Sequence, residues 1–147
     1  MSFLELENID VSYDKKNKIL EDLNLSIDNG EFVSLLGPSG CGKTTTLRVI
    51  AGFIEPMSGR FVLDGKDYTN IPVHKRNFGM VFQSYALFPH LNVFDNVAFG
   101  LKRRKEKKSE ITEKVNKILK TVDLENLSKR YPKELSGGQR QRVAIAR

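Results

Sequence analysis

The chain has 147 residues, of which 39% are hydrophobic and 29% are charged. This composition suits a globular domain with its own core and excludes an extended disordered chain. No apolar run approaches the roughly 20 residues that a membrane-spanning helix needs, and we expect no secretory signal at the beginning of the chain. Because Cys41 is the single cysteine, an internal disulfide is excluded and a reducing compartment is expected.

The formal net charge of +6 comes almost entirely from one short segment. Residues Lys102 to Lys108, KRRKEKK, hold six cations and one anion, and the remainder of the chain carries only +1. A local run of this kind is typical of a solvated linker or the start of a helix. We therefore expect no direct binding to nucleic acid.

The first part of the chain alternates apolar and polar residues, which is typical of β-strands. Residues 4–13 show this alternation with a register step near Asn8, and residues 18–27 repeat it after a turn. Asn29-Gly30 predicts a hairpin turn into the next segment. That segment, 31–37 (EFVSLLG), is continuously apolar and predicts a strand buried on both faces of a parallel sheet.

The elements that follow change from mixed α/β to helical. A helix is expected over 43–54 and strands over 58–65 and 78–83, where short apolar runs end in turn residues. Further along, the apolar spacing predicts a helix over 92–101 and another over 109–122, with Ser109 as the cap of the second. A basic helix is expected after Pro132.

A glycine-rich motif stands between the strand expected at 31–37 and the helix after it. Gly37, Gly42, Lys43 and Thr44 fit G-x-x-x-x-G-K-[ST]. Glycines allow backbone N–H groups to close around phosphate oxygens, and the helix N-terminus adds partial positive charge. The lysine can reach β- and γ-phosphates, and the threonine hydroxyl can ligate Mg²⁺. The alternative is an ordinary glycine-rich turn before a helix.

A second motif, LSGGQ at Leu135 to Gln139, resembles the signature sequence of ABC-type ATPases. Alone, Ser-Gly-Gly before a helix is usually a cap and a turn, but together with the first motif it is specific. The resemblance covers essentially the whole chain. It implies an α/β P-loop NTPase fold with a RecA-like core, an N-terminal antiparallel β subdomain and a helical subdomain, incomplete at the C-terminus. The implied segments are 1–84 for the β subdomain and core, 85–135 for the helical subdomain and 136–147 for the signature helix.

The resemblance also implies a role for individual residues. Tyr13 would stack on the adenine of ATP, and Gln83 would contact Mg²⁺ and the attacking water. Lys43 and Gln83 would be the catalytic residues, and Thr44 and Gln83 would hold the metal. The phosphate-binding segment would comprise Gly37, Pro38, Ser39, Gly40, Cys41, Gly42, Lys43, Thr44 and Thr45.

The signature residues are implied to act on a second subunit. In the family, such residues press on a γ-phosphate held by the partner, so that ATP closes a head-to-tail dimer. The residues concerned are Ser136, Gly137, Gly138 and Gln139. We expect the first three, Ser136, Gly137 and Gly138, to present bare N–H groups to that phosphate.

In the family, a strand ending in aspartate, a catalytic glutamate and a loop histidine follow the signature. Asp64, His74 and His90 all precede it, and they are expected to be ordinary turn and loop residues without metal-ligand spacing. The chain thus resembles the N-terminal part of an ABC ATPase whose general base is not among these residues. We expect the 147-residue chain by itself to hydrolyse ATP very poorly while it retains nucleotide affinity.

The segment VFQSYALFPHLNVFDNVAFGLK resembles the ATPases of bacterial importers. The resemblance implies import powered by ATP, with polyamines (spermidine or putrescine) as the first candidate substrate and phosphonate, ferric iron or sugar as alternatives. It further implies transmembrane permease subunits as partners, a substrate-binding protein as an indirect one, and a peripheral position on the cytoplasmic face of the membrane. The rival hypotheses are a soluble ABC ATPase not coupled to transport and a catalytically inactive nucleotide-binding fragment.

Overall fold

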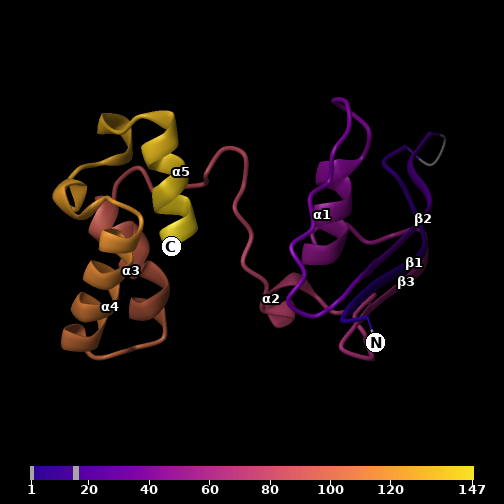
Figure 1. Ribbon diagram of the computed structural model, residues 1–147, viewed down its shortest axis with the longest axis horizontal. Coiled ribbons are helices and arrows are strands. Elements are labelled where there is room, and N and C mark those ends of the chain that lie inside the picture. Colours follow the sequence, from indigo (N-terminus) through magenta and orange to yellow (C-terminus); the bar gives the residue numbers. More distant parts are fainter. Residues whose placement is uncertain (1, 15–16) are drawn as a thin grey trace. The chain divides into compact units, whose positions relative to one another are not determined.

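The computed structural model describes residues 2–14 and 17–147. The chain divides into two compact units, Met1–Gly79 and Met80–Arg147, which are drawn in Figure 1. Lys15 and Lys16, which belong to the turn expected before residue 18, lie outside the described residues.

The first unit is built on a four-stranded antiparallel sheet of order β2-β1-β3-β4. Alternate residues of the central strand β1 are buried, as the period of two requires. The ladders of β1 with β2 and with β3 both shift register between residues 6 and 10, and Asn8 has a φ of 50°. The register step expected near Asn8 is therefore confirmed. The strands are β1 (Leu4–Ser12), β2 (Lys18–Ile27), β3 (Ser58–Leu63) and β4 (Lys66–Asp67).

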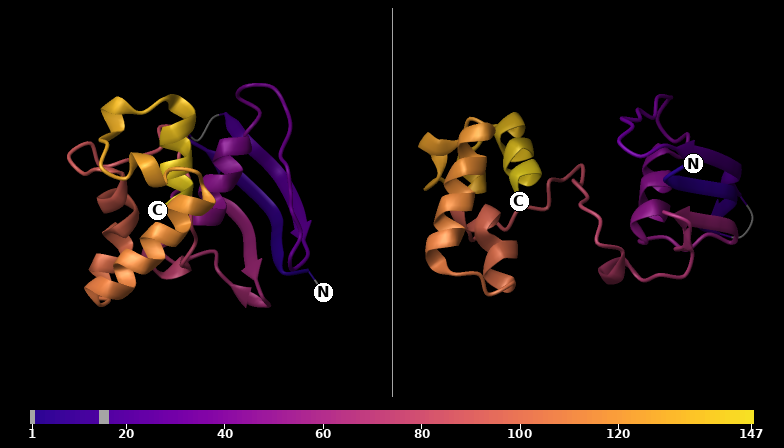
Figure 2. Two further views of the ribbon diagram at one scale, coloured as in Figure 1. Left: turned by 60° about the vertical axis from the view of Figure 1, so that its left-hand side comes forward. Right: turned by 60° about the horizontal axis from the view of Figure 1, so that its bottom comes forward.

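One helix completes the core of this unit. α1 (Lys43–Ala51) lies beside the sheet, as both views in Figure 2 show. Its buried Val49 packs into the same apolar cluster as Leu6, Ile9 and Phe61 of the strands. The short helix α2 (Val73–Arg76) follows the sheet. The helix expected over 43–54 is thus confirmed, but it ends three residues earlier, at Ala51. Gly52 follows it with a φ of 85°, which is typical of a glycine C-cap.

Two predicted strands do not form. Segments 31–36 and 78–83 have no strand assignment, and the side chains of Phe32 and Leu36 are 94% and 89% exposed. The turn at Asn29-Gly30 is present, but no hairpin follows it. A strand of a parallel sheet exists only through hydrogen bonds to neighbouring strands, and the sheet of the described residues includes neither segment. Both segments are apolar, but neither has a neighbouring strand with which to form ladder hydrogen bonds, and so neither is a strand.

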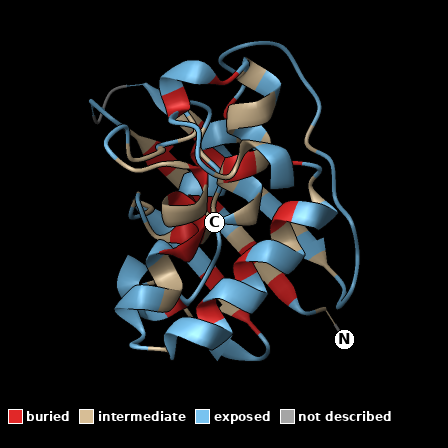
Figure 3. Ribbon diagram, turned by 90° about the vertical axis from the view of Figure 1, so that its left-hand side faces the viewer, coloured by how far each residue is buried: buried red, intermediate tan, exposed pale blue. Residues whose placement is uncertain are grey.

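The second unit is helical. Its core gathers one face of each main helix, with Val93 and Val97 from α3, Val115 and Leu119 from α4, and Val143 from α5. Figure 3 shows these buried strips on the helices. α4 begins one residue before Ser109 and has Lys107 at its N-cap, so the expected serine cap is wrong. The elements are α3 (Val93–Arg103), α4 (Lys108–Thr121), η1 (Glu125–Leu127), η2 (Pro132–Glu134) and α5 (Gly137–Ala146).

None of the helices among the described residues is both long enough and apolar enough to cross a membrane. The helices that do form owe their stability to packing of apolar stripes within each unit.

Candidate functional site

The loop at 37–42 turns sharply into α1. Gly40 and Gly42 have φ angles of 85° and 92°, in the left-handed region that favours glycine. A Cβ on Gly42 would lie 2.5 Å from Cδ2 of Leu20 and 3.2 Å from the carbonyl oxygen of Ile19. Only glycine therefore lets the end of the loop approach strand β2 so closely, and this approach determines where α1 begins.

The first turn of α1 presents backbone N–H groups that have no acceptor within the helix. The first backbone bond of the helix runs from Thr46 N to Gly42 O at 2.8 Å, so the N–H groups of Lys43, Thr44 and Thr45 precede it. This end of the helix carries partial positive charge, and its first turn contains no acidic residue that would offset the charge. Such a helix end attracts anions, phosphate above all.

The ammonium group of Lys43 folds back over the loop. Its Nζ donates to the carbonyl oxygens of Gly37 at 2.7 Å and Pro38 at 2.6 Å, and it lies 3.3 Å from Sγ of Cys41. An ammonium has three donors on a flexible stem. It can therefore exchange these carbonyls for phosphate oxygens presented to the same loop with little movement of its backbone.

The three consecutive threonines differ in their exposure. Thr45 and Thr46 are buried, and Thr46 Oγ1 donates to Gly42 O at 3.1 Å, whereas Thr44 is exposed. A hydroxyl oxygen at the position of Thr44 suits Mg²⁺ as one ligand among several. Among the described residues, no group of three or more His, Cys, Asp or Glu could hold a metal. The residues thus fit an Mg²⁺ ion that is shared with phosphate oxygens and waters.

The register of the strands brings Tyr13 to the same end of the sheet as the loop. Val11 is opposite Leu20 in the β1–β2 ladder, and Leu20 is the residue that Gly42 approaches. Tyr13 comes one residue after the end of β1, and its side chain is 62% exposed. Its ring can therefore offer an apolar face for stacking close to the phosphate loop.

The remaining predicted site residues belong to the second unit. Gln83 is exposed in the first turn of that unit, where Tyr85 N donates to Phe82 O at 2.8 Å. The signature residues lie farther along the same unit. The predicted residues thus fall into two sets. The first unit holds the loop and Tyr13, and the second unit holds Gln83 and the signature.

Two residues that sequence analysis did not single out hold the segment after Gln83. Asn96 is fully buried, accepts from Phe88 N at 2.9 Å and donates to Leu91 O at 2.9 Å. Arg147 donates to Ala86 O at 2.7 Å and lies over the Phe88 ring at 5.2 Å from its centroid. Asn96 interrupts the apolar stripe of α3, which was the signal that could have identified it. Arg147 gave no such signal.

The signature begins α5 with a reciprocal cap. Ser136 Oγ accepts from Gln139 N at 3.2 Å, and Gln139 Oε1 accepts from Ser136 N at 2.9 Å. This S-x-x-Q pattern is a capping box, and the sequence-based interpretation of a cap is confirmed. The expectation of a bare N–H at Ser136 is wrong, because the glutamine side chain already occupies it. The glycines Gly137 and Gly138 form the first turn of the helix.

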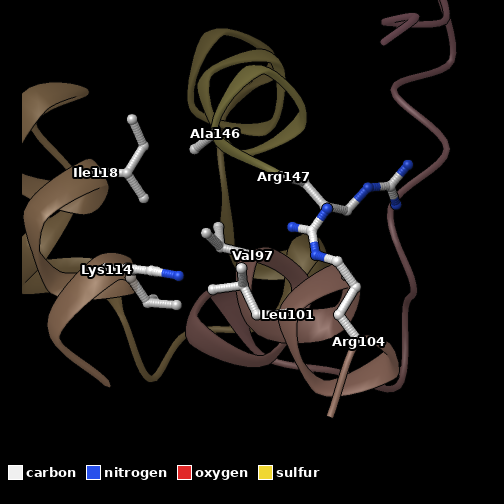
Figure 4. Close-up of a pocket in the computed structure, with 9 residues that line it drawn as sticks. Val97, Leu101, Arg104, Lys114, Ile118, Ala146 and Arg147 are labelled. Atoms are coloured by element: carbon white, nitrogen blue, oxygen red, sulfur yellow. The ribbon is translucent and has the colours of Figure 1, made fainter. Parts of the chain in front are cut away.

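A pocket of about 220 Å³ opens between α3, α4 and α5 (Figure 4). Its floor is apolar and includes Val97, Leu101 and Ile118. Cations surround it, and two of them, Lys114 and Arg104, share the carboxylate of Glu106 at 2.6 Å and 3.6 Å. None of the predicted site residues lines this pocket.

The comparison with protein families decides the assignment. Residues 20–147 match the family described as ABC transporter. The chain belongs to this family. Its membership explains why a phosphate loop and an LSGGQ cap occur together, and it confirms the predicted α/β P-loop NTPase fold class.

Several curated ABC relatives carry the name spermidine/putrescine import ATP-binding protein PotA. The protein of Mesoplasma florum is 56% identical over 146 residues, and that of Spiroplasma citri is 58% identical over 146 residues; each match covers 99% of this chain. The protein of Acidothermus cellulolyticus is 62% identical over 125 residues, which is 85% of this chain and 33% of that protein. The chain spans 41% of the length of each of the first two relatives.

Solved ABC structures show the same fold. The ATP-binding cassette MJ0796, described as dimeric and bound to ADP and Pi in a post-hydrolysis state, is 33% identical with a TM-score of 0.87, and the match covers 97% of this chain and 67% of that one. The cbiO1 protein of Clostridium perfringens, described as part of the ABC transporter complex cbiONQ, is 33% identical with a TM-score of 0.85, over 99% of this chain and 60% of that one. The division into segments 1–84, 85–135 and 136–147 stays a prediction.

Proposed function

We propose that this chain is the nucleotide-binding part of an ATPase subunit that powers import through a membrane ABC transporter. The observation that carries the proposal is the Lys43 ammonium, held over the glycine loop at the N-terminus of α1 by the carbonyls of Gly37 and Pro38. Loop, helix end and ammonium together form a cradle for a polyphosphate. A chain of the ABC family would use such a cradle for ATP.

Within this proposal, each residue has a defined task. The backbone N–H groups of residues 39–45 bind phosphate oxygens, and Lys43 moves from the loop carbonyls to the β- and γ-phosphates. Thr44 and Gln83 supply oxygen ligands for Mg²⁺, and Tyr13 stacks on adenine. The metal, when bound, neutralises charge that develops on the phosphate oxygens. Neither Lys43 nor Gln83 can act as a strong general base for water, so we expect the 147-residue chain alone to turn over ATP slowly.

The proposed partners follow from the position of the signature. The glycines that open α5 are expected to face the γ-phosphate bound by a second subunit, in a head-to-tail dimer that ATP closes. The dimeric description of the related cassette MJ0796 supports this arrangement. Transmembrane permeases would be the other direct partners, with a substrate-binding protein acting through them. The subunit would lie on the cytoplasmic face of the membrane.

Polyamine is the proposed substrate class. The support is the identity of 56% and 58% along nearly the whole chain to proteins named for spermidine and putrescine import. Phosphonate, ferric iron and sugar stay alternatives because an ATPase subunit does not itself select the transported molecule.

Binding of Mg-ATP tests the nucleotide proposal. We expect Lys43→Ala to weaken ATP binding to the 147-residue chain at least tenfold in calorimetric titration. Lys66→Ala, which removes an exposed lysine of β4 in the same unit, is the matched control and should leave binding unchanged. Thr44→Ala should weaken binding only when Mg²⁺ is present. Equal affinities of the parent and Lys43→Ala would overturn the proposal.

Uptake by a chimera tests the transport proposal. In the chimera, the 147 residues replace the corresponding part of the Mesoplasma florum relative. The chimera is expressed in cells whose spermidine uptake depends on that relative. Restored ATP-dependent uptake of labelled spermidine, lost with Lys43→Ala, is the expected result. A chimera that folds and hydrolyses ATP without restoring uptake would favour the soluble ATPase, and one that binds ATP without hydrolysis would favour the inactive fragment.

A further inference from the structure

The densest positive charge of the chain lies on the turn between α3 and α4. Residues 102–108 contain six cations and a single anion. The turn closes at one end of the helical unit, opposite the end at which α5 begins (Figure 1). It therefore lies away from the signature, and none of its residues is among the predicted nucleotide-binding or signature residues, although Arg104 lines the pocket between the helices.

Ion pairs within the unit neutralise only part of this charge. Lys102 donates to Asp95 at 2.6 Å, on the exposed side of α3. The one anion of the segment, Glu106, has a side chain only 20% exposed and turns toward Lys114 at 2.6 Å and Arg104 at 3.6 Å. The carboxylate of Glu106 is thus paired with Lys114 of α4 and with Arg104.

Four cations remain exposed, and the described residues show no ion pair for any of them. We call them the tip cations: Arg103, Lys105, Lys107 and Lys108. Lys105 has a φ of 59°, which reverses the chain. One helical turn before Arg103, Phe99 is 36% exposed, and the Arg103 guanidinium lies 6.0 Å from its ring centroid.

We propose that the tip cations, with Phe99, bind the surface of an anionic phospholipid membrane. An exposed ring with one long basic side chain over it and three further exposed cations in the next few residues suits an interface in which charged heads meet phosphates and apolar stems meet the lipid boundary. The tip cations are exposed and lie at the end of α3, in the turn after it and at the start of α4. Separate headgroups can therefore each meet one cation. The choice of a membrane rests on the proposed function, which places the subunit at the membrane face.

Nucleic acid is the competing class of anionic polymer. Single-stranded nucleic acid is bound in grooves with several aromatic platforms. Among the described residues, the ring beside the tip cations is Phe99 of α3, which is partly exposed and lies 4.4 Å from the Phe88 ring. The observations therefore favour lipid, and a nucleic-acid arm belongs to the test.

The test compares two variants of equal charge by sedimentation with vesicles of phosphatidylcholine containing 30% phosphatidylglycerol. Lys105→Glu/Lys107→Glu/Lys108→Glu reverses three tip cations, and Lys117→Glu/Lys120→Glu/Lys129→Glu reverses three exposed cations elsewhere in the same unit. Each basic residue near an anionic surface contributes about fivefold to binding. We expect the tip variant to lose at least tenfold in partitioning, the control less than threefold, and pure phosphatidylcholine to bind neither. Circular dichroism confirms that both variants fold.

Three outcomes would overturn the inference. Equal losses in the two variants would show that only net charge acts, and equal binding of the parent to neutral and anionic vesicles would exclude headgroup charge. Tighter binding to a single-stranded oligonucleotide than to vesicles, lost in the tip variant, would assign the tip to nucleic acid. The sedimentation contains no nucleotide, so failure of the lipid inference is separable from failure of ATP binding at Lys43.

Discussion

Arg76 donates from Nη1 to the carbonyl oxygen of Val49 at 2.8 Å and so joins α2 to the last turn of α1. The same nitrogen donates to Ile50 O at 2.8 Å, and Nε donates to Ile71 O at 2.6 Å. Arg76 is 5% exposed, and this burial lowers the pKa of its guanidinium. A cation at this place faces the negative end of the helix dipole. α1 is therefore held by the glycine loop at its beginning and by Arg76 at its end.

Replacing Arg76 should destabilise the first unit. Arg76→Met keeps much of the apolar stem but leaves buried carbonyls without donors, and we expect a loss of about 3 kcal/mol in the free energy of unfolding. Urea unfolding measures it. Arg60→Met is the matched control, because Arg60 pairs with Asp67 at 3.1 Å on the surface, and such pairs contribute about 1 kcal/mol or less. Equal losses would contradict a special role for Arg76.

The two left-handed glycines of the phosphate loop should respond differently to alanine. At Gly40 a Cβ meets nothing within 4 Å, so Gly40→Ala carries only the cost of its φ of 85°, about 1–2 kcal/mol. At Gly42 a Cβ would also collide with Leu20 Cδ2 at 2.5 Å. We expect Gly42→Ala to destabilise the unit by about 1–3 kcal/mol more, and thermal unfolding of the pair isolates this steric contribution. Identical melting temperatures would show that β2 yields to the added methyl group.

Asn96 should be essential for the order of the segment after Gln83. Asn96→Ala leaves the amide of Phe88 and the carbonyl of Leu91 without their side-chain partner, and we expect a loss of about 3 kcal/mol. Hydrogen exchange of residues 86–92 should accelerate in this variant. Asn116→Ala, on the exposed face of α4, serves as the comparison and should change stability by about 0.5 kcal/mol or less. Unchanged exchange at 86–92 in Asn96→Ala would refute the assignment.

Asp10 should make the stability of the first unit depend on pH below 4. Hydrogen bonds from the backbone of Asp22 and from Lys18 and Ser58 lower its pKa from 3.8 to about 2. The contribution of a carboxylate with a lowered pKa is complete above the unfolded value of 3.8 and is lost as the pH falls through 2.

Denaturant unfolding between pH 6 and pH 2 can follow this loss. The parent should be more stable than Asp10→Asn at pH 6, and the difference should narrow as the pH falls below 4. Asp64→Asn, at an exposed turn, serves as the control, and its free energy of unfolding should differ from that of the parent by the same small amount at every pH. A difference between the parent and Asp10→Asn that stays constant down to pH 2 would mean that the carboxylate charge does not contribute.

Local patterns in the sequence predicted several features that depend on near neighbours only. The step in β1 at Asn8, the start of α1 after Gly42 and the cap formed by Ser136 and Gln139 all involve residues a few positions apart. Such features follow from backbone preferences and short-range hydrogen bonds. The strand predicted over 31–36 was wrong for the opposite reason. A parallel strand forms only with neighbouring strands, and residues within the segment cannot supply them.

Reading the residues alone was enough to identify the class of the molecule, because the glycine loop with Lys43 and the LSGGQ cap have local chemistry and their combination is specific to one family. The contacts that support these motifs became visible in the folded chain: Leu20 against Gly42, Arg76 at the end of α1, and Asn96 and Arg147 around the segment after Gln83. These contacts join residues distant along the chain. Which polar side chain becomes buried against which distant carbonyl depends on packing in three dimensions, and no spacing along the sequence encodes it.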